Sequence, residues 1–258
     1  MWEIIGSMPN FGAAHCAMLA LLVVLVAVCV PAARRIRGTD LEARVFPWCG
    51  WALLAWSIGW WIWAMLPANW NPGESLPFHY SDALRLITAM ALITRRRFWL
   101  ALLFYWGLTL NLQAVVTPSL NYYVTPSAEF VDYWSFHILV QLAAIVIVWG
   151  YGYRPAWRDF WWAYGFAVAW AVVAGVGNVI SGGNYGFLTN KPPTASALDI
   201  MPEWPWYIPI LLLLVGGVWS LMTWPLARRG RNLGNPGETT YVTPDTPGTI
   251  RGIDRAAP

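Results

Sequence analysis

The sequence predicts an all-α polytopic membrane protein with seven transmembrane helices. Three observations support this fold class. Hydrophobic residues make up 58% of the chain, charged residues make up only 11%, and there are 20 tryptophans. The apolar residues are also gathered into runs of about 20, the length of helix that crosses the ~30 Å hydrocarbon layer of a bilayer. This pattern excludes an ordinary soluble globular protein.

The predicted spans follow one another with short connections. In chain order they cover residues 13–33, 46–66, 77–94, 98–117, 130–150, 160–181 and 206–226. The first could instead be a cleaved signal peptide, but its arginines follow the apolar run rather than precede it, which favours a retained span. The cysteines, Cys16, Cys29 and Cys49, fall at different depths of the first two spans, so the sequence suggests no disulfide framework.

The arginines predict the orientation, because basic residues near span ends are retained on the cytoplasmic side. They cluster after the first, third, fifth and seventh spans, in the segments 34–44, 95–97, 154–158 and 228–231. We therefore expect the N-terminus outside and the C-terminus in the cytoplasm of a cell (plasma) membrane. This topology accounts for the net charge of +3, so we expect no nucleic-acid partner.

Two regions are predicted from the change in composition near the C-terminus. Residues 1–227 form the seven-helix domain, and residues 228–258, rich in Gly, Pro and Thr, form a disordered cytoplasmic tail. The chain contains no phosphate-binding loop, dinucleotide fingerprint or paired-cysteine metal motif, so we expect no cofactor.

Polar residues inside the spans lie almost entirely in the half that faces outward. They are His15, His79, Ser81, Asp82, Arg85, Gln113, Thr117, His137, Gln141, Asn178 and Ser181. Because an Asp or an Arg at a membrane helix centre costs about 2.5–3.5 kcal/mol, these groups should face the protein interior rather than lipid. We expect one outward-facing polar cavity formed by the first, third, fourth, fifth and sixth spans.

Structural roles compete with this interpretation. Asp82 and Arg85 are spaced i to i+3 and could simply neutralise one another. A lone serine in a membrane helix usually bonds to its own backbone, and a lone histidine usually serves packing. The external loop 182–205 offers a cover for the cavity through Asn184, Tyr185 and Lys191, whereas its Trp204 and Trp206 favour interfacial anchoring.

Several stretches resemble a family of bacterial integral membrane proteins that is grouped with the eukaryotic transmembrane protein 164, a phospholipid acyltransferase. They are SLPFHYSDALRLITAMALITRRR from Ser75, YWGLTLNLQAVVTPSL from Tyr105, WSFHILV from Trp134, GGNYGFLTNKPPTASALD from Gly182, and WPWYI from Trp204. The resemblance covers about residues 10–226. It implies a cysteine on the third span and a histidine on a later span as a catalytic pair, which map to Ser81 and His137, with serine in place of the cysteine.

The resemblance therefore implies acyl transfer from a membrane lipid. His137 would accept the proton of Ser81, whose oxygen attacks an ester, and Asp82 would orient a histidine. The expected substrate-binding residues are His15, His79, Arg85, Gln113, Asn184, Tyr185 and Lys191. Cys16 is a rival source of the missing thiol, although Ser81 is preferred.

Two other functions remain open. The cavity could bind a lipid without catalysis, or the chain could be a scaffold subunit of an envelope complex with partner membrane proteins. Alternatively, His15, His79 and His137 with Asp82 could hold a metal for hydrolysis, although no metal-ligand spacing supports this.

Overall fold

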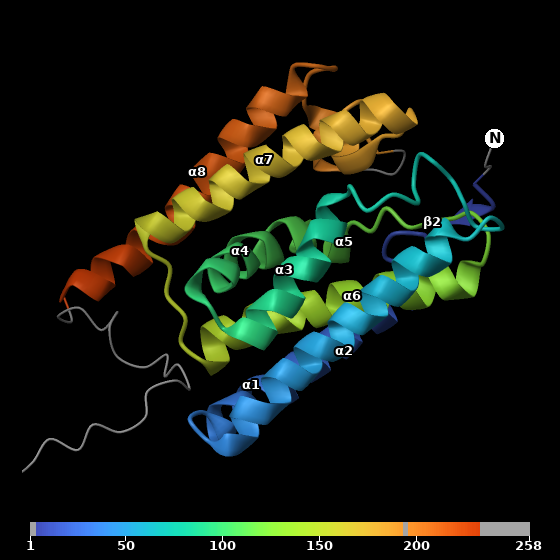
Figure 1. Ribbon diagram of the computed structural model, residues 1–258. Coiled ribbons are helices and arrows are strands. Elements are labelled where there is room, and N and C mark those ends of the chain that lie inside the picture. The colour runs from blue at the N-terminus through green and yellow to red at the C-terminus, as the bar shows by residue number, and fades with distance from the viewer. Residues whose placement is uncertain (1–3, 193–195, 233–258) are drawn as a thin grey trace, which may run out of the picture.

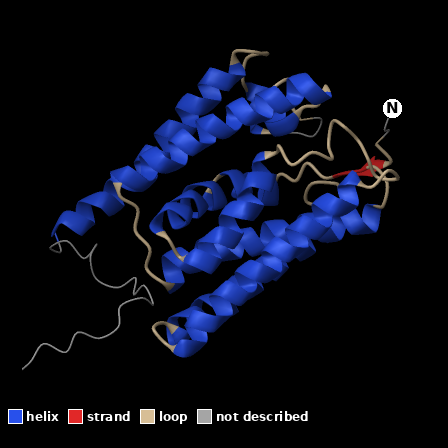
Figure 2. Ribbon diagram, in the orientation of Figure 1, coloured by secondary structure: helices blue, strands red, loops and turns tan. Residues whose placement is uncertain are grey.

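The computed structural model describes residues 4–192 and 196–232, most of which are helical (Figures 1 and 2). The elements are β1 (Gly6–Ser7), α1 (Ala13–Ile36), α2 (Asp40–Met65), α3 (Tyr80–Thr94), α4 (Arg97–Leu108), α5 (Leu110–Val116), β2 (Asn121–Tyr122), α6 (Pro126–Ile145), the π-helical turn η1 (Val146–Gly150), α7 (Trp157–Ser181), the 3-10 turns η2 (Tyr185–Phe187) and η3 (Ala197–Ile200), and α8 (Tyr207–Asn232).

Each predicted span corresponds to helical residues in the structure, although the third predicted span forms a shorter helix than the others. Within the described residues, six helical stretches are long and apolar enough to cross a membrane: α1, α2, α4 with α5, α6 with η1, α7, and α8. The remaining predicted span, 77–94, corresponds to α3, which has 15 residues. At 1.5 Å per residue α3 is about 22 Å long, less than the ~30 Å of a hydrocarbon layer, so its crossing stays a prediction.

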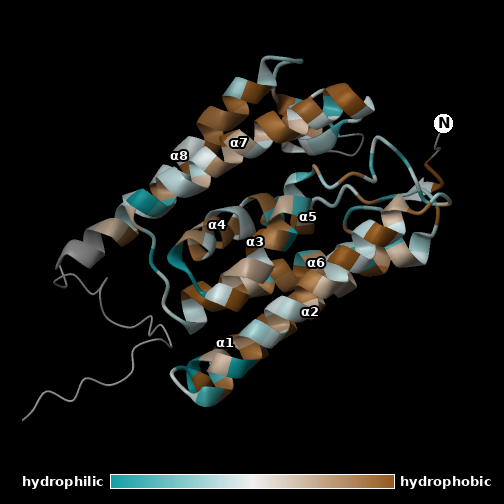
Figure 3. Cartoon of the chain, viewed as in Figure 1, coloured by the Kyte–Doolittle hydropathy of each residue, from teal (hydrophilic) through white to brown (hydrophobic). Residues whose placement is uncertain are grey.

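The helices pack around a buried centre formed by α3, α4 and α6 (Figure 1). α2 packs on α3, α1 on α6 and η1, and α4 joins α6 to α7, which in turn packs on α8. Apolar side chains on the outer faces of α1, α2 and α8, such as Val23, Trp48 and Leu213, remain exposed. Hydrophobic residues cover these helices on the outside as well (Figure 3), as expected of surfaces that meet lipid.

The predicted fourth span, 98–117, is broken into two helices at Thr109, where the backbone leaves the helical conformation at φ −125° and ψ −69°. The Thr109 hydroxyl donates to the carbonyl of Tyr105 at 2.5 Å and accepts the indole N–H of Trp219 at 3.0 Å. Trp219 comes from α8, so a distant helix holds the break. The break sets the direction of α5 independently of α4.

At the end of the bundle where α1 begins, the N-terminal segment pairs with the connection between α5 and α6. Strand β1 runs antiparallel to β2, with Gly6 opposite Tyr122 and Ser7 opposite Asn121. The backbone N–H of Met8 extends the pairing to the carbonyl of Leu120 at 3.1 Å. This pairing fixes the start of α1 beside α6.

The predicted C-terminal tail begins at residue 228, but α8 continues to Asn232. The rest of that predicted tail, residues 233–258, lies outside the described residues.

Candidate functional site

A buried ion pair connects the two helices that carry the predicted catalytic residues. Arg85 of α3 donates from Nη1 to Oδ1 of Asp132 on α6 at 3.1 Å, and from Nη2 to Oδ2. Trp56 of α2 donates to the same Oδ1 at 2.9 Å, and the Arg85 guanidinium lies 4.2 Å from the centre of the Phe136 ring. Two charges that face lipid would be costly, whereas this arrangement neutralises both inside the protein.

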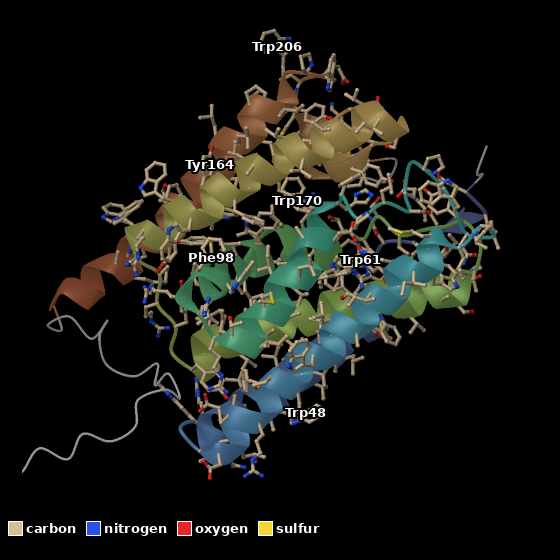
Figure 4. The ribbon with its side chains drawn as sticks, viewed as in Figure 1. Trp48, Trp61, Phe98, Tyr164, Trp170 and Trp206 are labelled. Atoms are coloured by element: carbon tan, nitrogen blue, oxygen red, sulfur yellow. The ribbon has the colours of Figure 1, made fainter. Side chains whose placement is uncertain are left out.

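The alternative in which Arg85 pairs with Asp82 is not realised, because Arg85 binds Asp132. Asp82 points toward α2, where its Oδ1 accepts the indole N–H of Trp61 at 2.9 Å, and its Oδ2 accepts the backbone N–H of His79 at 3.0 Å. Trp61 and Trp170 flank the outer part of α3 (Figure 4), and the Trp170 indole donates to the carbonyl of His79 at 3.2 Å. Asp82 thus caps α3 and contacts His79 through the backbone.

His137 lies inside a hydrogen-bonded network with α5. Its Nδ1 is 2.7 Å from Oδ1 of Asn111, and Nδ2 of Asn111 donates to the His137 carbonyl at 2.9 Å and to Oε1 of Gln141 at 3.0 Å. His137 and Asn111 are 6% and 1% exposed. Because Nδ2 of Asn111 faces two oxygens, it is the NH₂ nitrogen, and the other amide atom is the oxygen Oδ1. This oxygen must accept a hydrogen bond from a protonated Nδ1 of His137. The neutral ring then keeps its lone pair on Nε2, which no described residue hydrogen-bonds.

Ser81 is half-buried one turn before Arg85 on α3, and within residues 4–192 and 196–232 no group hydrogen-bonds its hydroxyl. Helices α3 and α6 run in the same direction (Figure 1), and the contact of Arg85 with Asp132 sets their register. Ser81 lies four residues before that level and His137 five residues after it, an axial offset on the order of 10 Å. The structure thus shows no hydrogen bond between Ser81 and His137.

Two predicted substrate-binding residues have other surroundings. The His15 ring is completely buried, with Nδ1 accepting the backbone N–H of Phe11 at 2.8 Å and Nε2 lying 2.9 Å from the carbonyl of Val115. Nδ1 therefore holds the segment just before α1, while Nε2 attaches the start of α1 to α5. Gln113 is exposed on α5, whereas Asn111, two residues earlier, faces inward. Residues two apart on a helix point in nearly opposite directions, about 200° apart.

His79 belongs to the outer loops rather than to the buried network. Its Nε2 lies 3.4 Å from Oε2 of Glu74, and its ring packs against Tyr185 with centroids 4.9 Å apart. Burial by itself lowers the pKa of His79, but the hydrogen bond that its ring donates to Glu74 and the charges of Asp82 and Glu74 outweigh it, so the pKa is raised.

The loop after α7 packs against His79 at the start of α3, through Tyr185 and Phe187. The Tyr185 hydroxyl donates to the carbonyl of Pro72 at 2.7 Å and accepts the N–H of Leu76 at 3.0 Å, which joins the loop after α7 to the loop before α3. Asn184 organises its own loop, with Oδ1 accepting the N–H of Thr189 at 3.1 Å. Lys191 lies farther along and pairs with Glu203 at 3.0 Å.

An open groove of about 530 Å³ lies between these two loops. Its lining is polar and comes mainly from Asn71, Glu74, Tyr123, Asn178, Asn184, Thr189 and Asn190, together with Gly73, Gly182, Gly183 and Ile4. Of the predicted site residues, only Asn184 borders it directly. Tyr185 and His79 do not line the groove, but each contacts a loop residue next to it: Tyr185 donates to Pro72, and His79 lies against Glu74.

Sequence analysis did not identify Asn111 and Asp132 as site residues. Asn111 lies in the stretch LTLNLQ, two residues before Gln113, and an amide deeper in the span than Gln113 is the signal that could have identified it. Asp132 falls just inside the start of the predicted fifth span, 130–150. Its role follows from Arg85, because a buried arginine requires an acidic partner.

The predicted metal arrangement is not formed in the part of the chain that the structure describes, where no group of three or more His, Cys, Asp or Glu side chains could hold an ion. His15, His79 and His137 take part in three separate sets of contacts.

A comparison of the sequence with models of protein families finds a match over most of the chain. The sequence model of the TMEM164 family matches residues 10–223, which include every described helix from α1 to most of α8. No curated protein and no solved structure matches the chain.

Proposed function

The chain belongs to the TMEM164 family of membrane proteins, and on that basis we propose that it is a membrane-embedded lipid acyltransferase or acyl hydrolase with His137 as its general base. The observation that carries this proposal is the state of the His137 ring. Nδ1 is held as a donor to Asn111, and the Nε2 lone pair has no partner among the described residues. A general base needs such an unshared lone pair near the reacting hydroxyl.

Ser81 is the proposed nucleophile, as the family resemblance implies. Its proton passes to Nε2 of His137 while its oxygen attacks the carbonyl carbon of a lipid ester, and the lipid alkoxide leaves with that proton. An acceptor hydroxyl, or water, then attacks the acyl-serine, gives its proton to His137, and restores the Ser81 hydroxyl. This route requires the outer part of α3 to approach α6 when substrate binds, because the two side chains do not contact each other in the structure.

Arg85 supports this chemistry from the same face of α3 as Ser81. Two of its nitrogens bind Asp132, and its Nε has no hydrogen-bond partner among the residues that the structure describes. We assign Nε as a donor to the carbonyl oxygen on which negative charge develops. His79, Asn184, Tyr185 and Lys191 belong to the outer mouth through which the lipid headgroup would be reached.

The proposal includes a topology. α3 is the seventh membrane helix, the N-terminus lies outside the cell membrane, the C-terminus lies in the cytoplasm, and the site opens to the outer leaflet. The run of Arg95, Arg96 and Arg97 after α3 supports this orientation, since such runs are retained in the cytoplasm.

A second function, lipid binding without catalysis or a scaffold role beside partner membrane proteins, is favoured by one observation. Ser81 stands where the family resemblance places a cysteine, and its hydroxyl does not contact His137.

An assay in lipid nanodiscs tests the proposal. The protein receives phosphatidylcholine with a labelled sn-2 acyl chain and an unlabelled lysophospholipid, and both labelled product and free fatty acid are measured. We expect His137→Gln to lower turnover by about 10²-fold or more, because base catalysis of this kind contributes 10²–10⁴-fold. Gln113→Ala, which changes an exposed side chain, is the control and should keep full turnover.

Ser81→Ala separates the two routes to acyl transfer. An equally large loss supports the acyl-serine route, whereas retained turnover would mean that His137 activates the acceptor hydroxyl directly. Full activity in folded His137→Gln would overturn the proposal. Stoichiometric lipid binding by the wild type without any turnover would instead support the binding role.

A further inference from the structure

We propose that Asn111 is a positioning residue that fixes the tautomer of His137 and leaves Nε2 as its basic nitrogen. This inference rests on the proposed function only for its catalytic meaning. The tautomer itself follows from hydrogen bonds and can be measured without any reaction.

A backbone oxygen determines the orientation of the Asn111 amide. The carbonyl of His137 can only accept a hydrogen bond, so the atom of Asn111 that lies 2.9 Å from it must be the NH₂ nitrogen. The second hydrogen of that nitrogen is directed to Oε1 of Gln141 at 3.0 Å. The remaining atom, Oδ1, therefore faces Nδ1 of His137 at 2.7 Å, and Nδ1 must carry the proton.

The surroundings leave little freedom to reverse this arrangement. Asn111 and Gln141 are 1% and 3% exposed, so water does not compete freely for their hydrogen bonds. Rotating the amide by half a turn would place its oxygen against the His137 carbonyl and its NH₂ group against Nδ1. That rotation would leave a buried carbonyl without its donor and bring two acceptors together, at a cost of about 1–3 kcal/mol for each unsatisfied group.

The break at Thr109 makes this contact possible. Asn111 is the second residue of α5, and α5 departs from the path of α4 because the Thr109 hydroxyl is held by Tyr105 and by Trp219 of α8. In an unbroken helix the direction of Asn111 would be set by α4.

Nuclear magnetic resonance of ring ¹⁵N in labelled histidine tests the inference directly. The chain has only three histidines, so His15→Gln and His79→Gln assign the spectrum by elimination. In the wild type at neutral pH, we expect His137 to show a protonated Nδ1 and an unprotonated Nε2. A proton on Nε2 with none on Nδ1 would overturn the inference, whatever the behaviour of the variants.

Two substitutions separate positioning from bulk packing. Asn111→Asp keeps an oxygen that accepts from Nδ1, so the wild-type tautomer should persist, whereas Asn111→Leu, of similar size, should shift His137 toward a proton on Nε2. Unchanged His15 and His79 signals report that each variant is folded. An unshifted His137 spectrum in folded Asn111→Leu would contradict the positioning role.

Turnover of the same variants links the inference to the proposed function. With the wrong tautomer the lone pair faces away from the reacting hydroxyl, so Asn111→Leu should lower kcat by about tenfold or more while KM changes little. If His137→Gln keeps full activity but the tautomer follows Asn111 as expected, the proposed function fails and the positioning inference stands. If His137 is essential but its tautomer is indifferent to Asn111, the positioning inference fails alone.

Discussion

Asp132 and Arg85 form a bidentate pair inside the protein, with Trp56 as a third partner. Removing the charge of Asp132 would leave the buried guanidinium of Arg85 without an acidic partner. The pair therefore fixes α3 against α6 at the level of Arg85 and Asp132, and the approach of Ser81 to His137 in the proposed route is confined to the turn of α3 that precedes Arg85.

We predict that Asp132→Asn lowers the free energy of unfolding by about 3–5 kcal/mol, the usual cost of breaking a buried pair by removing one partner. Thermal or denaturant unfolding in nanodiscs measures the change. The double variant Asp132→Asn with Arg85→Met should recover much of the loss, because no unpaired charge remains. Equal destabilisation in the single and double variants would show that shape rather than charge decides the contact.

His79 gives the outer loops a dependence on pH. Its folded pKa is raised above 6.5 by Glu74 and Asp82 despite burial, and the neighbouring Tyr185, whose pKa burial raises to about 12, stays neutral throughout. For a group with a raised folded pKa, the extra stability is fully present below the unfolded value, near 6.5, and disappears as pH rises through the folded value.

We therefore predict that the wild type exceeds His79→Gln in stability by the largest margin at about pH 5.5 and by a smaller margin at about pH 8.5. Unfolding midpoints of both proteins at the two pH values measure this margin. Glu74→Gln, which removes the closest negative charge, should reduce the pH dependence as well. A margin that grows with pH would contradict the assignment.

The sequence predicted the depth of individual polar residues correctly but not their partners on other helices. Depth along a span follows from counting residues, so placing His137 and Arg85 inside the protein required no structure. Partners across helices do not follow from counting. Arg85 binds Asp132, 47 residues away, rather than the neighbouring Asp82, because the direction of each side chain depends on which helix lies opposite.

At the scale of elements, the contact between α2 and α3 depends on a glycine. A Cβ at Gly50 would lie 2.7 Å from Cγ1 of Ile93 and 2.8 Å from the backbone oxygen of Ala89. The side chain of Ile93 can rotate, but the backbone of α3 can move away only if the helices separate. Close approach through small residues is a common way for membrane helices to pack.

We predict that Gly50→Ala destabilises the fold by about 1–3 kcal/mol, the usual cost of overpacking. Gly59→Ala is a matched control in the same helix, because a Cβ there would meet nothing within 4 Å. That substitution should be neutral or stabilising by up to about 1 kcal/mol, as alanine favours the helical state. Equal effects at Gly50 and Gly59 would indicate that α2 and α3 are not in close contact.

Element positions were predictable because each helix in a bilayer must satisfy its backbone internally over a known thickness. The run 98–117 was correctly identified as helical, but its break at Thr109 was not predicted. Neither proline nor any local pattern marks that position, and the indole that accompanies the break comes from Trp219, 110 residues away. Because the sequence did not predict this break, it also did not predict the direction of α5. For that reason Gln113 was expected in the site and Asn111 was not.

At the scale of the whole molecule, composition and length were sufficient to predict a helical membrane protein, because so apolar a chain has few other ways to bury its surface. Six helical stretches of the described residues are long and apolar enough to cross a membrane, whereas α3 is the one among the predicted spans that falls short of the length needed. Its 15 residues lie below the usual span, yet its N-terminal neighbour Pro77 and the arginines after Thr94 fit a short, interior helix that is shielded from lipid by α2 and α4.

Cysteine labelling in intact cells decides between six and seven crossings. In a background without Cys16, Cys29 and Cys49, single cysteines replace Ala68 before α3 and Arg96 after it, both of which are exposed. If α3 crosses the membrane, an impermeant maleimide labels Ala68→Cys directly and Arg96→Cys only after permeabilisation. Labelling of both sites from the same side would show that α3 does not cross.

The same experiment tests the orientation with two further exposed sites, Gly38 between α1 and α2 and Asn190 between α7 and α8. We expect Asn190→Cys to be labelled from outside, together with Ala68→Cys, and Gly38→Cys to require permeabilisation, because the arginine-rich connections are retained in the cytoplasm. The reverse pattern would turn the groove of Glu74 and Asn184 toward the cytoplasm. In that case the proposed site would draw its lipid from the inner leaflet, with its residues unchanged.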